Sequence, residues 1–217
     1  MTEFRLRIGF AKKDAAIWLS HLEVVRAMER CIRRSGLPYA ISQGFSPHMK
    51  HSFTSALPVG TGSNVEYMDV ELSSLVDPAL ALDSLQAVQH ECLPVLSAGY
   101  AAKDAPSLQI YFNQAQYLIA IEDPGGTLVP DLVRSLQTPR EIQVKKKGKS
   151  KTYDLSFYVV EATRVADHSD SLYLSLLSRP EGSLRPEVIL AALAEPLGKA
   201  VKIISLTRIK LEHKDLG

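Results

Sequence analysis

Cysteine is scarce in this chain of 217 residues, which contains only Cys31 and Cys92. Two cysteines cannot form a disulfide framework or a four-cysteine metal site. Iron–sulfur clusters are held by several closely spaced cysteine thiolates, whereas these two lie in separate predicted helices. We therefore expect the purified protein to carry no such cluster.

Long apolar segments are also missing. The longest, residues 188–194, is far shorter than the roughly 18 residues that span a bilayer. The first residues alternate between polar and apolar and lack the basic-then-apolar pattern of a signal peptide. We expect no membrane association and a cytoplasmic location.

The motifs that bind common cofactors and metals are incomplete. Gly60 and Gly62 lack the third glycine of a dinucleotide fingerprint, and no helix is predicted after them. His48 and His51 stand on a loop without nearby cysteines, which matches no usual zinc spacing. The sequence therefore predicts neither a cofactor nor a metal ion.

Charge, by contrast, is present and unevenly distributed. Residues 1–60 contain nine Lys and Arg against four Asp and Glu, a net charge of +5. Residues 61–100 contain six acids and no Lys or Arg. This segregation predicts one basic face, which would attract phosphate, and one acidic face. The alternative is two solvated surfaces of different charge.

The N-terminal half shows the pattern strand, helix, strand, strand, helix, strand. Ser20 and Glu23 form a capping-box pattern before a helix predicted over 20–34, which Gly36 ends. A second helix is predicted from residue 77 to about 92. The predicted strands span residues 4–11, 52–57, 65–72 and 95–102.

The second half looks like a looser repetition. Helices are predicted near 129–137 and, capped by Ser183, to about residue 195. Strands are predicted near 116–122, 140–146, 154–165, 171–178 and 201–211. We therefore predict an α+β fold of two tandem ferredoxin-like lobes, 1–103 and 114–217. A basic hairpin tip is predicted around Lys147.

The region from residue 18 to 71 carries a series of distinctive segments. They read Trp18-Leu-Ser-His-Leu-Glu, Gly36-Leu-Pro, Ser42-Gln-Gly-Phe-Ser-Pro-His, Ala56-Leu-Pro-Val-Gly and Glu66-Tyr-Met-Asp. This series resembles the radical-SAM-linked proteins, a bacterial family whose members occur alone or fused behind a radical SAM domain. The resemblance implies a separate radical SAM enzyme as partner, because this chain lacks the cysteines to be that enzyme.

The predicted first helix bears a row of arginines. Arg26, Arg30 and Arg33 are three or four residues apart and so share one side, away from the apolar stripe. Arginine's planar fork suits phosphate, and nearby basic or aromatic residues would extend this nucleic-acid-binding surface: Lys12, Lys13, Phe45 and Lys50. The alternative is a solvated helix face in which Glu29 pairs with Arg33.

The loop from residue 43 to 51 is the second candidate site. Gly44 permits unusual backbone angles, and Phe45 is either buried or able to stack on a base. His48 in this loop and His21 at the helix start both titrate near neutral pH, so they form a conceivable proton-transfer pair. Alternatively, their hydrogen bonds only lock the loop onto the helix.

Three functions remain open from the sequence. The leading hypothesis is a non-catalytic accessory protein that presents RNA, or a ribonucleoprotein such as a ribosomal component, to the radical SAM enzyme. The second is an RNA-cleaving or RNA-modifying enzyme that uses His21 and His48. The third is a protein–protein adaptor that docks through the acidic 61–100 surface and does not touch RNA.

Overall fold

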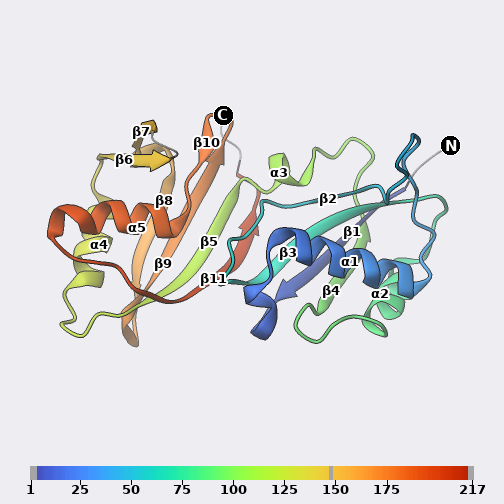
Figure 1. Ribbon diagram of the computed structural model, residues 1–217, viewed down its shortest axis with the longest axis horizontal. Helices are drawn as coiled ribbons and strands as arrows, with labels where there is room; N and C mark the ends of the chain where they lie inside the picture. The colour runs from blue at the N-terminus through green and yellow to red at the C-terminus, as the bar shows by residue number, and fades with distance from the viewer. Residues whose placement is uncertain (1–3, 147–148, 215–217) are drawn as a thin grey trace. The chain divides into compact units, whose positions relative to one another are not determined.

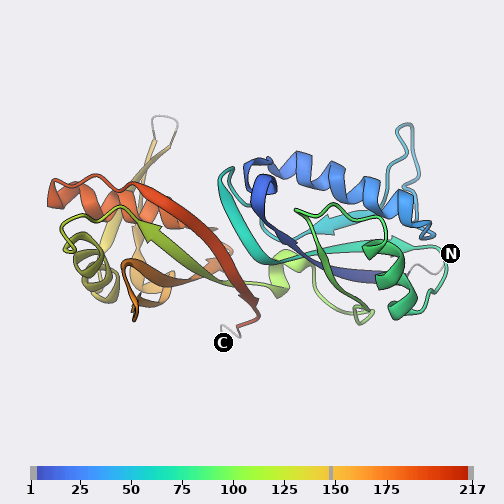
Figure 2. The same cartoon turned by 90° about the horizontal axis from the view of Figure 1, so that it is seen from below.

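The computed structural model of the protein describes residues 4–146 and 149–214. The chain divides into two compact units, Met1–Phe112 and Asn113–Gly217 (Figures 1 and 2). Each unit combines helices with antiparallel strands, so the predicted α+β class is confirmed.

The first unit has the element order strand, helix, strand, strand, helix, strand. Its main elements are β1 (Phe4–Lys12), α1 (His21–Ser35), β2 (His51–Phe53), β3 (Thr61–Leu72), α2 (Pro78–Gln86) and β4 (Val95–Tyr100). Two short helices, η1 (Asp14–Trp18) and α3 (Leu108–Tyr111), accompany them. Strand β3 pairs with β2 and β1, and β1 pairs with β4, all antiparallel.

One face of this sheet forms the core of the unit. Leu6, Ile8 and Phe10 of β1 are at most 1% exposed and pack with buried Met28 and Ile32 of α1. Figure 1 shows α1 lying across the strands. The apolar stripe predicted for this helix is therefore the face that holds it on the sheet.

Helix α2 is shorter than the sequence predicted, ending at Gln86 rather than near Cys92. The side chains of Gln86 and Gln89 bond to the backbone of Val95 at the start of β4. The Nδ1 atom of His90 accepts a hydrogen bond from the amide of Cys92 at 3.1 Å. Together these bonds hold a turn where the sequence predicted a further helical turn.

Strand β2 also ends earlier than predicted, at Phe53 instead of residue 57. The hydroxyl of Thr54 turns inward and donates to the carboxylate of Glu66 at 2.9 Å. This buried polar contact lies where the sequence predicted that side chains would go on alternating between the two faces of a strand.

The second unit has a strand-rich middle. Its elements are β5 (Gln114–Ile121), α4 (Leu128–Gln137), β6 (Glu141–Lys146), β7 (Lys149–Asp154), η2 (Leu155–Phe157), β8 (Val159–Val165), β9 (His168–Arg179), β10 (Gly182–Ser183), α5 (Pro186–Ala194), η3 (Glu195–Leu197) and β11 (Ile203–Glu212). Strands pair antiparallel as β8 with β9, β9 with β5, and β5 with β11. A separate hairpin joins β6 to β7.

Three predictions for this unit need correction or restriction. Ser183 does not cap α5: it pairs with Ser178 in the β9–β10 hairpin, and Arg185 occupies the N-cap position before Pro186. The predicted strand 154–165 is divided by η2. The tip of the basic hairpin, Lys147 and Gly148, lies outside the described residues.

Candidate nucleic-acid interface

Helix α1 is fixed at both ends by its own sequence. The Ser20 hydroxyl accepts from the amide of Glu23, and the Glu23 carboxylate accepts from the Ser20 amide at 2.8 Å. Gly36 ends the helix with a φ of 74°, a conformation that favours glycine. The capping box and the glycine stop are both confirmed, and the buried apolar stripe sets which helix face points outward.

The outward side of α1 carries the exposed arginines Arg26, Arg30 and Arg33, which we call the α1 arginine face. Within the described residues, the guanidinium groups of Arg26 and Arg30 make no hydrogen bond or ion pair. Arg33 differs, because it lies 3.5 Å from Glu29, whose carboxylate also contacts His51 at 3.0 Å. Two of the three arginines are thus available to an external anion.

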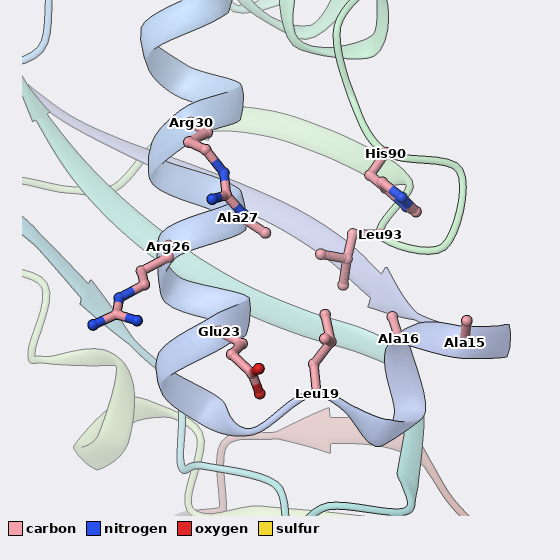
Figure 3. A pocket seen from close by; sticks show the side chains of 9 residues that line it. All are labelled: Ala15, Ala16, Leu19, Glu23, Arg26, Ala27, Arg30, His90 and Leu93. Atoms are coloured by element: carbon pink, nitrogen blue, oxygen red, sulfur yellow. The ribbon is translucent and has the colours of Figure 1, made fainter.

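A hollow of about 460 Å³ lies beside this face, and we call it the α1 pocket. Figure 3 shows Ala27 of α1 and Leu93 of the turn before β4 pointing toward each other across it. Ala16 and Leu19 continue this apolar surface. The remaining lining residues are Ala15, Glu23, Arg26, Arg30 and His90.

The one acidic group of this pocket is engaged in the helix cap. The carboxylate of Glu23 accepts hydrogen bonds from the hydroxyl and the amide of Ser20, at 2.7 and 2.8 Å. These bonds lower the pKa of Glu23, and the positive charge of Arg26 acts in the same direction. The cationic character of the rim therefore comes from Arg26 and Arg30.

Lys12 is not on the surface, contrary to its predicted place in the binding patch. Its side chain is buried, and its amino group donates to the carbonyls of Ile17 and Thr61, each at 3.1 Å. The next residue, Lys13, is exposed. The amino group of Lys12 thus links η1 to the start of β3. Of these two lysines, Lys13 is the one whose side chain is available to phosphate.

His21 lies over a small polar cluster rather than beside His48. Its ring packs edge-on against Phe53, with centroids 5.7 Å apart. Partial burial lowers the pKa of His21 below its ordinary value of 6.5; nearby Glu66 opposes this shift, while His51 and Lys12 add to it. His21, Lys12 and Glu66 line a cavity of about 20 Å³, room for little more than one water.

His48 is held within its own loop. Its Nδ1 atom lies 2.9 Å from the Ser42 hydroxyl and 3.1 Å from the Ser46 carbonyl. Its backbone amide also donates to the Ser42 hydroxyl. In the described part of the chain no contact joins His48 to His21, so the structure does not assemble the predicted proton-transfer pair.

Phe45 and Lys50 have different surroundings. Phe45 is fully exposed in the loop that follows α1, beside Gly44 with a φ of 137°. Lys50 is half-buried in a separate hollow of about 510 Å³ that also contains Asp69 and Glu71. Phe45 is therefore presented to solvent, whereas Lys50 lines a hollow that Asp69 and Glu71 also line.

The sheet face opposite the core is not an open base-stacking platform. The ring of Tyr67 stacks on Phe112, with centroids 4.4 Å apart and planes nearly parallel. Arg7 pairs with Asp69 at 2.9 Å and lies over the ring of Tyr111. These aromatic and cationic groups satisfy one another, which leaves the α1 side as the candidate interface of this unit.

Sequence reasoning missed His90 and Leu93, because the second helix was predicted to continue to about residue 92, so the turn that carries both residues was not foreseen. No local pattern signalled this turn, because the side chains of Gln86 and Gln89 bond to Val95 at the start of β4. Within residues 4–146 and 149–214, no cluster of His, Cys, Asp or Glu is arranged to hold a metal ion. Over the same residues, no helix has the length and apolarity needed to cross a bilayer.

Solved structures similar to this chain include subunits of RNA–protein particles. A chain of a Cbf5-Nop10-Gar1 complex matches with a TM-score of 0.50 and 9% identity. A chain of an H/ACA RNP bound to a substrate RNA containing 2′-deoxyuridine gives 0.48 and 10%, and one of an archaeal box H/ACA sRNP Nop10-Cbf5 complex gives 0.46 and 12%.

These matches cover 95% of this chain but only 50%, 49% and 49% of the other chains, respectively. The chain thus spans about half the length of the structures it matches. At 9% identity, the likeness to the Cbf5-Nop10-Gar1 chain concerns the fold alone. A search of curated protein sequences found no match.

A family model also matches the chain. It is described as "Uncharacterized protein conserved in bacteria (DUF2344)", and it matches residues 5–186. That range includes all the elements that build the α1 arginine face and the α1 pocket. The chain therefore belongs to this bacterial protein family.

Proposed function

We propose that the protein is a non-catalytic accessory protein that binds the RNA backbone through the α1 arginine face. The observation that carries this proposal is the pair Arg26 and Arg30, two exposed guanidinium groups without an ion pair in the described residues. Arginine pairs with phosphate through two parallel hydrogen bonds. Exposed Lys13 adds a further positive charge.

The fold supports a place in a larger assembly. The similar Cbf5-Nop10-Gar1 chain is a subunit of a complex, and the proposed role of this protein is to present an RNA or ribonucleoprotein to a partner. The enzyme alternative has less support, since it requires His21 and His48 to act on one substrate while each is held by different neighbours.

Charge-matched variants test this function. At fixed low salt, the triple variant R26Q/R30Q/R33Q is expected to bind total cellular RNA at least tenfold more weakly than the wild type. The control is K103Q/R140Q/R164Q, which removes three exposed positive charges elsewhere. Equal losses in the two variants would mean that net charge, not the α1 arginine face, determines binding.

We further propose that the partner is a separate radical SAM enzyme and that both act in the cytoplasm. The support is the sequence resemblance to radical-SAM-linked proteins. The chain's own Cys31 and Cys92 are buried in the core of the first unit. Affinity purification from cells with an immobilised wild-type protein should recover a radical SAM enzyme, and its absence from repeated purifications would refute this partner.

We also propose that the two units are ferredoxin-like domains. In both, the four main strands follow one pairing pattern: β2-β3-β1-β4 in the first and β8-β9-β5-β11 in the second. The sequence predicts lobes 1–103 and 114–217, and the compact units that we take as these domains are residues 1–112 and 113–217. Separate expression of residues 1–112 and 113–217 should give two cooperatively folding proteins; a failure of both to fold would show that neither is an independent domain.

A further inference from the structure

The α1 pocket combines two kinds of wall. Its floor is apolar, formed by Ala16, Leu19, Ala27 and Leu93, of which Ala16 and Leu93 are only 3% exposed. Its volume of about 460 Å³ falls in the range of roughly 300–1,000 Å³ found for small-ligand sites. Such a floor suits a flat, weakly polar group.

The rim supplies cationic groups and one hydrogen-bond donor. Figure 3 shows the guanidinium of Arg30 beside Ala27 and that of Arg26 directed away from Leu93. The Nδ1 atom of His90 accepts from the amide of Cys92, so in the neutral ring the proton sits on Nε2, which can donate to a ligand. An anion and a hydrogen-bond acceptor therefore both find partners at this rim.

We infer that the α1 pocket binds one nucleoside monophosphate unit. The base lies on the apolar floor, where the plane of Arg30 stacks against it, and the phosphate meets Arg26 and Arg30. Unpaired bases are commonly stacked on arginine planes and apolar side chains. This inference rests on the proposed RNA function, and it specifies the substrate as single-stranded, because a paired base is not available to the pocket.

The probes are adenosine 5′-monophosphate, adenosine and inorganic phosphate, each titrated into the full chain by calorimetry. The wild type should bind the monophosphate at least tenfold more tightly than adenosine or phosphate alone.

The substitution Ala27→Leu fills the floor of the α1 pocket, leaves every charge at its rim in place and keeps a good helix former on α1. The matched control is Ala191→Leu, at an exposed position of α5.

The A27L variant should bind the monophosphate at least tenfold more weakly than the wild type does. It should also lose the preference for single-stranded over double-stranded RNA. The A191L variant should match the wild type in both measurements. If A27L binds the monophosphate as tightly as the wild type does, or if the wild type binds the monophosphate no more tightly than phosphate, the inference is overturned. Neither result would affect the proposed RNA binding by the α1 arginine face. If A27L loses the monophosphate but the wild type binds no RNA, the pocket is a free-nucleotide site and the proposed RNA function fails.

Discussion

Lys12 and Lys13 are neighbours in the sequence but have opposite roles in the structure. The last residue of β1, Lys12, points into the unit and finds two carbonyl oxygens, whereas Lys13 points to solvent. Sequence alone counts both as surface charges, because lysine is rarely buried. Only the positions of the Ile17 and Thr61 carbonyls reveal that Lys12 has partners inside.

Substituting these two lysines by methionine should separate the roles. K12M leaves the Ile17 and Thr61 carbonyls without that donor, so we expect the free energy of unfolding to fall by about 2–3 kcal/mol. K13M should change it by less than about 0.5 kcal/mol. Urea unfolding of both variants makes the comparison, and equal stabilities would show that the buried ammonium contributes nothing.

The lowered pKa of His21 makes a prediction about stability at low pH. Because the folded-state pKa lies below the ordinary 6.5, the unfolded chain binds more protons as pH drops past 6.5. The folded state therefore loses stability as the pH falls from 6.5 through the lowered folded-state pKa of His21. Melting temperatures between pH 7.5 and 5.0 should fall less for H21Q than for the wild type; parallel curves would contradict the shift.

Helix α1 shows what the sequence predicts well. The capping box, the apolar stripe and the glycine stop each involve residues within a few positions of one another, so the pattern is local. The division of residues 154–165 by η2 is also local, since the Asp154 carboxylate accepts from the amide of Ser156, whereas the end of α2 depends on bonds from Gln86 and Gln89 to β4. Such bonds are not visible in a linear pattern, and neither is the α1 pocket, whose walls come from three separated segments.

A charged residue introduced into the core tests the predicted orientation of α1. Ile32 is fully buried against the sheet, so Ile32→Asp is expected to cost about 3 kcal/mol or more of unfolding free energy. The control is Leu22→Asp on the same helix, where the side chain of Leu22 is 56% exposed. This substitution should lower the free energy of unfolding by less than about 0.5 kcal/mol. A folded I32D protein with an unchanged melting temperature would mean that the assigned core face is wrong.

At the scale of the whole molecule, the predicted binding residues do not form one patch. The α1 arginine face and Lys13 are exposed, Lys12 is buried, and Lys50 lines another hollow together with Asp69 and Glu71. The loop between α1 and β2, which carries Phe45, projects from the first unit beside the C-terminal end of α1 (Figure 2). Charge counting located the basic segment, but side-chain packing decided which of its residues are exposed to solvent.

Phe45 should contribute to RNA binding by stacking rather than by charge. If a base stacks on its exposed ring, Phe45→Ala should weaken binding of single-stranded RNA by about 1–3 kcal/mol without changing the salt dependence. The exposed Phe157 in the second unit provides the control F157A, which should bind as the wild type does. An F45A protein with wild-type affinity would remove Phe45 from the interface.

The most direct test of the central claim is the slope of log affinity for RNA against log salt concentration. Phosphate contacts release condensed counterions, so wild-type affinity must fall as salt rises. R26Q and R30Q should each flatten the slope by about one unit, and R33Q should flatten it less, because Arg33 already pairs with Glu29. Slopes that stay at the wild-type value in all three variants, or a wild type that binds no cellular RNA at low salt, would contradict the claim and favour a protein–protein adaptor.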